Sequence, residues 1–184
     1  MTREEAHKLM EEMIKNPNLR KHGLAVEAIM KALAKKFNED EEEWGIVGLL
    51  HDADYELVEK DPKRHTLVTE EKLRPLGVSD RIINAIKAHH DGIKESRDNN
   101  LERAVYAADE LSGLITAVTL VRPEKKLSTV DVPAVMKKFK EKSFAAGANR
   151  EQILACEREL DIPLEEFVGI ALTAMQNISD ELGL

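Results

Sequence analysis

The sequence predicts an all-α fold, and three observations support this prediction. Ala, Leu, Lys and Glu are abundant in the 184 residues, whereas aromatic residues make up only 4%. Apolar residues recur at helical spacing, and no alternating run of Val, Ile, Thr and Tyr reaches the length of a strand. Prolines and glycines separate the periodic segments from one another. We therefore expect a compact bundle of several helices.

The N-terminal part of the chain is expected to form three helices. Thr2 caps the first, which ends near Asn16-Pro17. The second runs from about Arg20 to Phe37, and the third covers roughly 41–52.

The next three helices are each marked by a cap or a proline. Asp61-Pro62 has the form of an N-cap followed by proline at the first helical position, and predicts a helix that ends by Gly77. Ser79 caps a helix over 80–90, and a long helix over 101–121 ends at Arg122-Pro123. Further helices are expected after Asp131, after the segment 147–149 and from Pro163, with the stretch 122–128 as the best candidate boundary.

Charge and cysteine content exclude several function classes. Lys and Arg number 27 against 35 Asp and Glu, a net charge of −8, so the surface as a whole is unsuited to stable nucleic-acid binding. The single cysteine, Cys156, excludes an intramolecular disulfide and a cysteine-based zinc site. The N-terminus has no secretory signal, and the longest stretch without charge, 167–179, is shorter than a membrane span. A cytoplasmic location is the expectation, and the oligomeric state is left open.

His22 is the first candidate functional residue. It precedes residues 26, 29 and 33 of the second helix by four, seven and eleven positions, so it continues their apolar stripe and points inward. The alternative is a core histidine that is hydrogen-bonded to a carbonyl group.

His51 and Asp52 follow a run without charge, residues 44–50. Gly45 and Gly48 in this run allow another backbone to approach closely. Asp52 lies at the negative end of the helix dipole, which is unfavourable by about 0.3–1 kcal/mol, and a bound cation would offset this cost. The alternative is a His-Asp pair that only caps the helix.

Asp109 lies within the long helix, where it and Glu110 are the only charged residues between 104 and 121. A helix with apolar or small side chains on nearly every side is expected at the centre of the molecule. A carboxylate buried there needs a hydrogen-bond or charge partner. A hydrogen-bonded buried aspartate without metal is the alternative.

Three more histidines complete the set of candidates. His89 and His90 end the helix over 80–90, and both are able to point inward, while His65 lies just after Asp61-Pro62. Residues from several helices that converge on one point form inward metal sites in helical proteins. Imidazole and carboxylate ligands together suit Mn, Fe, Co, Ni or Zn, as one or two ions, better than Mg or Ca.

The ordered set His22, His51-Asp52 and Asp109 resembles the HD domain, a helical superfamily dominated by metal-dependent phosphohydrolases. The segments 22–28 (HGLAVEA) and 48–53 (GLLHDA) are close to the typical wording of its motifs. The resemblance covers roughly 20–121, and we expect a single HD-type domain over 1–184 with a C-terminal helical extension over 129–184.

The resemblance implies four signature metal ligands and a mechanism. The ligands are His22, His51, Asp52 and Asp109. His65 and His89 are similar to the additional ligands of two-metal branches, in which Asp52 bridges both ions. A metal-activated water would attack the phosphate ester, with Asp52 and Asp54 as catalytic residues, although Asp54 is alternatively a turn residue. His90, Arg64, Lys87 and Lys94 are the candidates for contact with substrate, and the three cations are alternatively ordinary solvated residues.

The expected substrate is a small phosphate ester, such as a nucleotide or a related monoester or diester. Two departures from the two-metal branches bear on it. Tyr55 stands where those branches often place a lysine, and no Gly-Tyr-Pro signature follows His89-His90. Two other functions stay open: a di-iron oxygenase that uses the same ligands, and a regulatory module that binds metal or ligand without catalysis.

Overall fold

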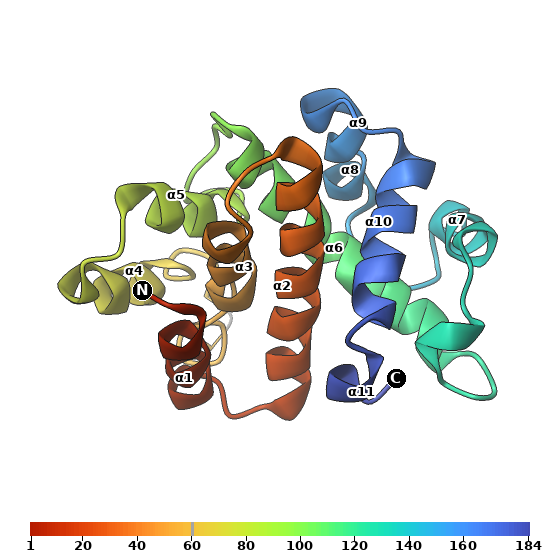
Figure 1. Cartoon of the computed structure of the whole chain (residues 1–184), viewed down its shortest axis with the longest axis horizontal. Helices are drawn as coiled ribbons and strands as arrows, with labels where there is room; N and C mark the ends of the chain where they lie inside the picture. The colour runs from red at the N-terminus through yellow and green to blue at the C-terminus, as the bar shows by residue number, and fades with distance from the viewer. Residues whose placement is uncertain (60) are drawn as a thin grey trace.

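The computed structural model describes residues 1–59 and 61–184, and every regular element in this part of the chain is helical (Figure 1). The predicted all-α fold is therefore confirmed. The elements are α1 (Arg3–Met13), α2 (Pro17–Phe37), α3 (Glu41–Leu50), α4 (Leu67–Leu73), the 3-10 turn η1 (Arg74–Leu76), α5 (Asp80–Ala88), α6 (Asn100–Leu120), the 3-10 turn η2 (Leu127–Thr129), α7 (Val132–Lys140), α8 (Arg150–Ile153), α9 (Ala155–Leu160), α10 (Leu164–Gln176) and α11 (Ser179–Leu182).

The closest helix packing in the fold is between α2 and α3. A Cβ atom on Gly48 of α3 would lie 2.8 Å from the backbone of Val26 and Glu27, so only glycine permits this approach. On α2, a Cβ atom on Gly23 would lie 3.0 Å from the carbonyl oxygen of Leu49. The predicted role of Gly48 is thereby confirmed. This contact brings the N-terminal half of α2 beside the C-terminal end of α3, so that His22 lies next to His51, the residue after α3.

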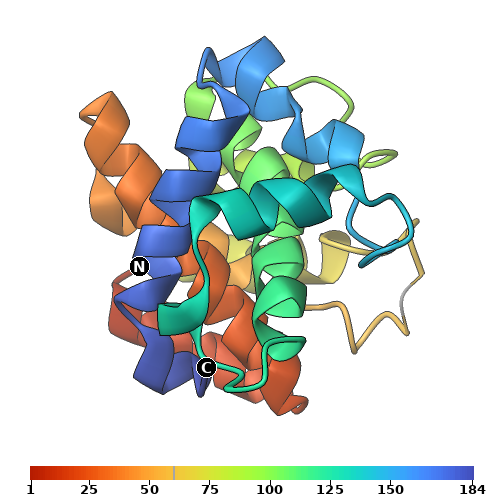
Figure 2. The ribbon, with the colours of Figure 1, turned by 90° about the vertical axis from the view of Figure 1, so that its right-hand side faces the viewer.

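The core surrounds α6, which lies behind α2 and α10 in Figure 1. Ala104, Ala107, Ala108, Leu111 and Ile115 on this helix have no exposed surface. Helices α2, α5, α7, α8 and α9 all pack against α6, and Figure 2 shows α7 crossing in front of it. A buried, mostly small-residue helix of this kind can carry a functional side chain into the centre of the molecule.

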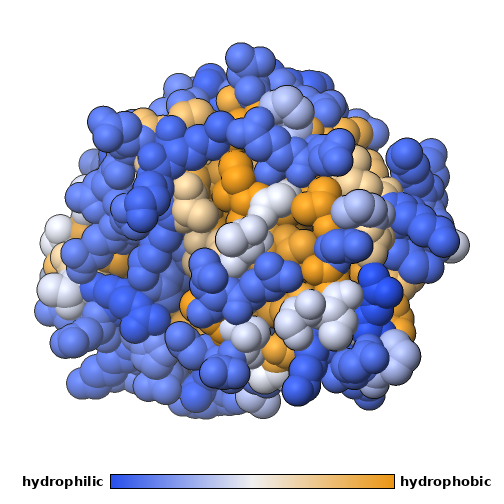
Figure 3. All heavy atoms as spheres, turned by 45° about the vertical axis from the view of Figure 1, so that its right-hand side comes forward, coloured by the Kyte–Doolittle hydropathy of each residue, from blue (hydrophilic) through white to orange (hydrophobic). Residues whose placement is uncertain are grey.

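The C-terminal helices α10 and α11 pack against α2 on the side away from α3. Helix α10 packs along α2, and α7 packs against both α6 and α10. On this side of the molecule, apolar side chains show at the surface within a largely hydrophilic periphery (Figure 3). Within residues 1–59 and 61–184, we found no helix with the length and apolar character needed to cross a membrane.

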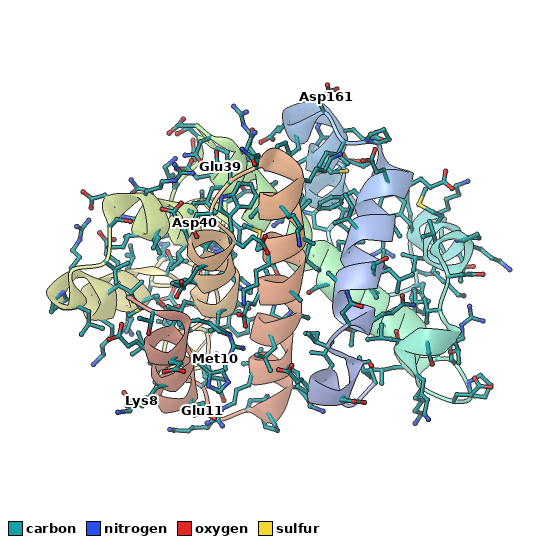
Figure 4. All side chains as sticks on the ribbon, in the orientation of Figure 1. Lys8, Met10, Glu11, Glu39, Asp40 and Asp161 are labelled. Atoms are coloured by element: carbon teal, nitrogen blue, oxygen red, sulfur yellow. The ribbon has the colours of Figure 1, made fainter. Side chains whose placement is uncertain are left out.

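Local caps explain most helix boundaries. Asn16 caps α2 with Pro17 at its first position, so this helix begins three residues earlier than predicted. Asp40, labelled in Figure 4 at the turn between α2 and α3, accepts hydrogen bonds from the backbone amides of residues 42 and 43.

Helix α1 is amphipathic. Its Met10 is buried, whereas Lys8 and Glu11 are exposed (Figure 4).

The predicted helix from Asp61-Pro62 to Gly77 is wrong in its first part. Residues 62–66 form turns, and α4 begins only at Leu67. Thr66 has a left-handed φ of 70°, which an α-helix does not accommodate. The Asp54 carboxylate accepts the amides of Thr66 and Thr69 and so fixes the start of α4.

Candidate metal centre

Three predicted ligands from three helices meet at one point, which we call the first half of the centre. His22 Nε2 of α2 lies 3.0 Å from Asp109 Oδ1 of α6 and 3.1 Å from His51 Nε2. His51 Nε2, just after α3, lies 3.5 Å from the same aspartate oxygen. The nitrogen and oxygen donor atoms of these residues all lie within 4.8 Å of one another, a spacing at which one metal ion contacts all three.

The second half of the centre is formed by His65 and His89. Their Nε2 atoms lie 3.0 Å apart, and both side chains are almost fully buried. His65 lies in the turn before α4, and His89 caps the C-terminal end of α5.

Asp52 lies between the two halves and presents one carboxylate oxygen to each. Its Oδ2 lies 3.7 Å from Nε2 of both His22 and His51. Its Oδ1 lies 3.1 Å from His65 Nε2 and 3.4 Å from His89 Nε2. This is the arrangement of a carboxylate that can bridge two metal ions.

All four histidines are oriented by a hydrogen bond at Nδ1. His51 and His89 donate from Nδ1 to the carbonyl oxygens of Gly48 and Ile86, at 2.7 and 2.6 Å. His65 donates to Asp54 Oδ1 at 2.8 Å, while the Ser112 hydroxyl, which itself donates to the Asp109 carbonyl, accepts from His22 Nδ1. With the Nδ1 proton fixed, the neutral form of each ring leaves Nε2 as a lone-pair donor toward the centre.

Electrostatics in the centre favour a cation. Burial opposes protonation of His51, but Asp52 and Asp109 outweigh it and raise its pKa to about 9. His65 shows the same balance and also has a pKa of about 9, with Asp52 and Asp54 as the opposing carboxylates. Burial likewise opposes ionisation of Asp52 and Asp109, yet the neighbouring histidines hold both pKa values well below the usual range. The site therefore attracts positive charge, which protons or metal ions can supply.

The donor set fits the metal type that the sequence suggested. Imidazole nitrogens and carboxylate oxygens, without thiolate, suit Mn, Fe, Co, Ni or Zn. The Nε2 atoms of the four histidines approach one another in two pairs and face carboxylate oxygens. The Nδ1 atom of each ring is hydrogen-bonded to another group, and such bonds orient histidine ligands toward these ions.

Asp54 occupies a different place from the one expected of a proton-transfer group. Its side chain is fully buried and does not line the cavity beside the centre. One oxygen accepts from His65 Nδ1 and the Thr66 amide, and the other accepts from the Thr69 amide at 2.9 Å. These bonds hold its pKa below the usual value despite burial. Asp54 is therefore placed to orient the His65 ring.

A cavity of about 620 Å³ opens beside the donor atoms. Proposed ligands from both halves line it, and so does His90, whose Nε2 donates to the Pro62 carbonyl at 3.1 Å. The lining residues are Leu19, His22, Asp52, Tyr55, Pro62, His65, His89, His90, Asp91, Asp109, Glu110 and Gln152.

The three cations expected near the substrate do not line this cavity, so that expectation is corrected. Lys87 pairs with Glu70 at 2.7 Å, and Lys94 pairs with Asp98 and Glu102. Arg64 is exposed and is likewise absent from the lining. The residues are close to the ligands along the chain, but their helical or turn positions direct the side chains elsewhere.

Sequence reasoning did not predict six residues of the cavity wall, of which Leu19 and Pro62 are apolar and the other four are polar or charged. Tyr55 packs edge-on against the His65 ring with the ring centres 5.5 Å apart, and Asp91 follows the histidine pair directly. Glu110 adjoins Asp109 and was visible as the second charge of an otherwise uncharged helix. Gln152 of α8 gave no signal, because nothing in its local sequence indicates that it reaches the carbonyls of His89 and Tyr106.

Comparison with known proteins agrees with this geometry. The family model described as HD domain matches residues 19–114, slightly more than half of the chain and the part that holds every proposed ligand. Ribonuclease Y of Sulfurovum sp. (strain NBC37-1) is 30% identical over 133 residues, which cover 71% of this chain and 26% of that protein. The chain therefore spans about a quarter of the length of this relative. No solved structure gave a significant match.

HD domains are generally metal-dependent phosphohydrolases, and the matched segment carries the histidine and aspartate cluster described above. On the evidence of the family model and the all-helical architecture, the chain belongs to the HD domain family.

Proposed function

We propose that this protein is a metal-dependent phosphohydrolase that cleaves a phosphate ester, such as a nucleotide or a related monoester or diester. The observation that carries the proposal is the position of Asp52, whose two oxygens face two separate groups of histidine nitrogens. Membership of the HD domain family and the ribonuclease relative support hydrolysis at phosphorus.

The proposed ligands divide between two ions. His22, His51 and Asp109 would hold the first, His65 and His89 the second, and Asp52 would contact both. When bound, divalent ions in such a site polarise the phosphoryl oxygen and lower the pKa of water.

The remaining side chains have supporting roles in this proposal. Asp54 fixes the His65 ring, and the Gly48 and Ile86 carbonyls fix those of His51 and His89. Burial and the nearby His65 lower the pKa of His90, which lines the cavity as a neutral ring. Its Nε2 donates to Pro62, so its Nδ1 is the atom that can accept a hydrogen bond from substrate. Because no lysine or arginine among the described residues lines the cavity, the charge of the phosphate must be met by the ions that these ligands hold.

The test is metal analysis of the purified protein together with a screen of phosphate monoesters and diesters, nucleotides included, in the presence of Mn, Ni, Co and Mg. We expect phosphate release that depends on added metal and disappears with a chelator. Oxygen consumption and a coloured protein as isolated, without phosphate release, would instead support the di-iron oxygenase reading. Stable metal binding without any turnover would support the regulatory module.

A further inference from the structure

The wall of the cavity beyond the ligands contains hydrogen-bond acceptors and acids. We propose that the substrate brings a single phosphoryl group to the metal centre and that the rest of it is neutral or cationic and rich in hydrogen-bond donors. Polyphosphates and polynucleotides are then poor substrates. This inference rests on the proposed function and narrows its substrate class.

Two carboxylates of the wall are not ligands of the proposed centre. Glu110 is half-buried, and its Oε2 accepts the amide hydrogen of Asn149 at 2.9 Å, a partner that leaves the negative charge uncompensated. Asp91 lies at the mouth, where it accepts from the Tyr106 hydroxyl at 2.9 Å and pairs with Arg97 at 3.2 Å. Arg97 also pairs with Glu159 at 3.3 Å, so its single charge is shared by two acids.

Gln152 adds a neutral acceptor from the C-terminal part of the chain, outside the matched HD segment. It is only 8% exposed, and its Nε2 donates to the carbonyls of Tyr106 and His89 at 2.9 and 3.3 Å. Because both partners only accept, the amide nitrogen must face them. The Oε1 atom has no partner within the described residues and is the atom that Gln152 can present to a ligand.

The cations around the cavity are paired with acids, and Arg97 is shared between Asp91 and Glu159. Lys87 and Lys94 are held by Glu70 and Glu102 at 2.7 and 2.6 Å, and none of the described lining residues is lysine or arginine. A second phosphate would therefore lie beside Glu110 and Asp91, where the charge of Arg97 is already shared by two acids.

The balance of charge at the metal centre also favours a substrate with a single phosphoryl group. Two divalent ions are neutralised by the carboxylates of Asp52 and Asp109 together with one phosphate monoester, which carries about −1.5 to −2 at neutral pH. A sugar, a nucleoside or an amine can donate hydrogen bonds to Gln152 and the two acids, whereas a further phosphate meets like charge.

The test compares matched pairs that differ by one phosphate. Hydrolysis of p-nitrophenyl phosphate by the metal-loaded protein is measured with AMP or adenosine 3′,5′-bisphosphate as competitor, then with glucose 6-phosphate or glucose 1,6-bisphosphate, and with single-stranded RNA. We expect at least one single-phosphate competitor to bind about tenfold or more tightly than its bisphosphate partner, and RNA to compete weakly. Calorimetric titration with propylphosphonate and propane-1,3-bisphosphonate, which cannot be hydrolysed, gives a binding ratio without turnover.

Variants that remove negative charge sharpen the test. In the double variant Asp91→Asn and Glu110→Gln, both hydrogen-bond acceptors are kept, and the preference for one phosphate should shrink several-fold. Glu71→Gln removes the same kind of charge from an exposed position on α4 and should leave the preference unchanged.

Several results would overturn the inference. These are equal or tighter binding of the bisphosphates or of RNA, failure of every single-phosphate compound to compete, or an unchanged preference in the double variant. If p-nitrophenyl phosphate and every ester of the screen stay intact with all metals, the proposed function itself fails. The calorimetric ratio still judges the charge preference in that case.

Discussion

The two halves of the centre are built in different ways. The first half takes its proposed ligands from α2, α6 and the end of α3, and close glycine contacts hold α2 against α3. The second half takes His65 from a run of turns and His89 from a helix end, and the buried carboxylate of Asp54 fixes the first of these. Packing of the core therefore orients one half, and a local hydrogen-bond network orients the other.

Because of this difference, the two halves should respond differently to substitutions. The first half cannot move without repacking α2 against α3, because both glycine contacts are already at their limit. The second half depends on a few polar contacts in a segment without regular helix, and such contacts can be altered singly. Substitutions can therefore affect both halves, one half, or only the residues that support one half.

Asp52→Ala is expected to have the largest effect, because it removes the carboxylate that faces both halves. We expect loss of bound metal and a fall in kcat/KM on the order of a thousandfold or more. Metal content and metal-dependent phosphate release, measured on a variant whose circular dichroism matches the parent, check this prediction.

Asp109→Ala should come next, because Asp109 is the only carboxylate among the described residues that faces the first half alone. We expect the first half to lose its metal ion. The second half, with His65, His89 and Asp52 as proposed ligands, should keep most of its bound metal. Full retention of metal and activity in this variant would mean that the His22–His51–Asp109 cluster is a hydrogen-bonded core element without a ligand role.

His65→Ala or His89→Ala should affect the second half only. We expect the metal content to fall from two ions toward one, with activity reduced accordingly. If only one ion binds the parent protein, metal content in these variants would hardly change, and both histidines would then act on the substrate or on the support of the centre.

Asp54→Asn should have a smaller effect, because it preserves shape but weakens the acceptor for His65 Nδ1 and the α4 amides. We expect a loss of about tenfold in the metal affinity of the second half, the lower end of the range for supporting residues. Metal titration that resolves two affinities checks this, and the first affinity, which does not involve Asp54, serves as the internal control.

The pH dependence of stability offers a comparison of metal-free and metal-loaded protein. The pKa values of His51 and His65 are raised from 6.5 to about 9, so protonation of these rings contributes stability that is complete below pH 6.5. This contribution is lost as the pH rises through about 9. We expect the Tm of the metal-free protein to fall between pH 7 and about 9.5, and that of the metal-loaded protein to fall less. If the Tm of the metal-free protein rises over this pH range, the raised pKa values of His51 and His65 are wrong.

The sequence predicted the fold and the first half of the centre better than the second half. Helical periodicity and caps indicated α2, α3 and α6, and the apolar stripe of α2 predicted an inward His22. The uncharged run and the helix dipole pointed to the His51-Asp52 pair, and the near absence of other charge in its helix pointed to Asp109. Residues 51–66 have no such period, so the false helix at Asp61-Pro62 and the role of Asp54 depended on contacts with residues farther along the chain.

The cavity wall shows the same limit. Proximity in sequence suggested Lys87 and Lys94 as substrate contacts, but ion pairs with Glu70 and Glu102 direct both away. Gln152 comes from a short helix more than sixty residues after His89, and only the tertiary packing of α8 on α6 brings it to the cavity.

The most direct test of the two-half centre is metal stoichiometry per chain for the parent protein and for Asp52→Ala, Asp109→Ala and His65→Ala. We expect two ions in the parent, close to none in Asp52→Ala, and about one in each of the other two variants. Full metal retention in both Asp52→Ala and Asp109→Ala would contradict the assignment of the site itself.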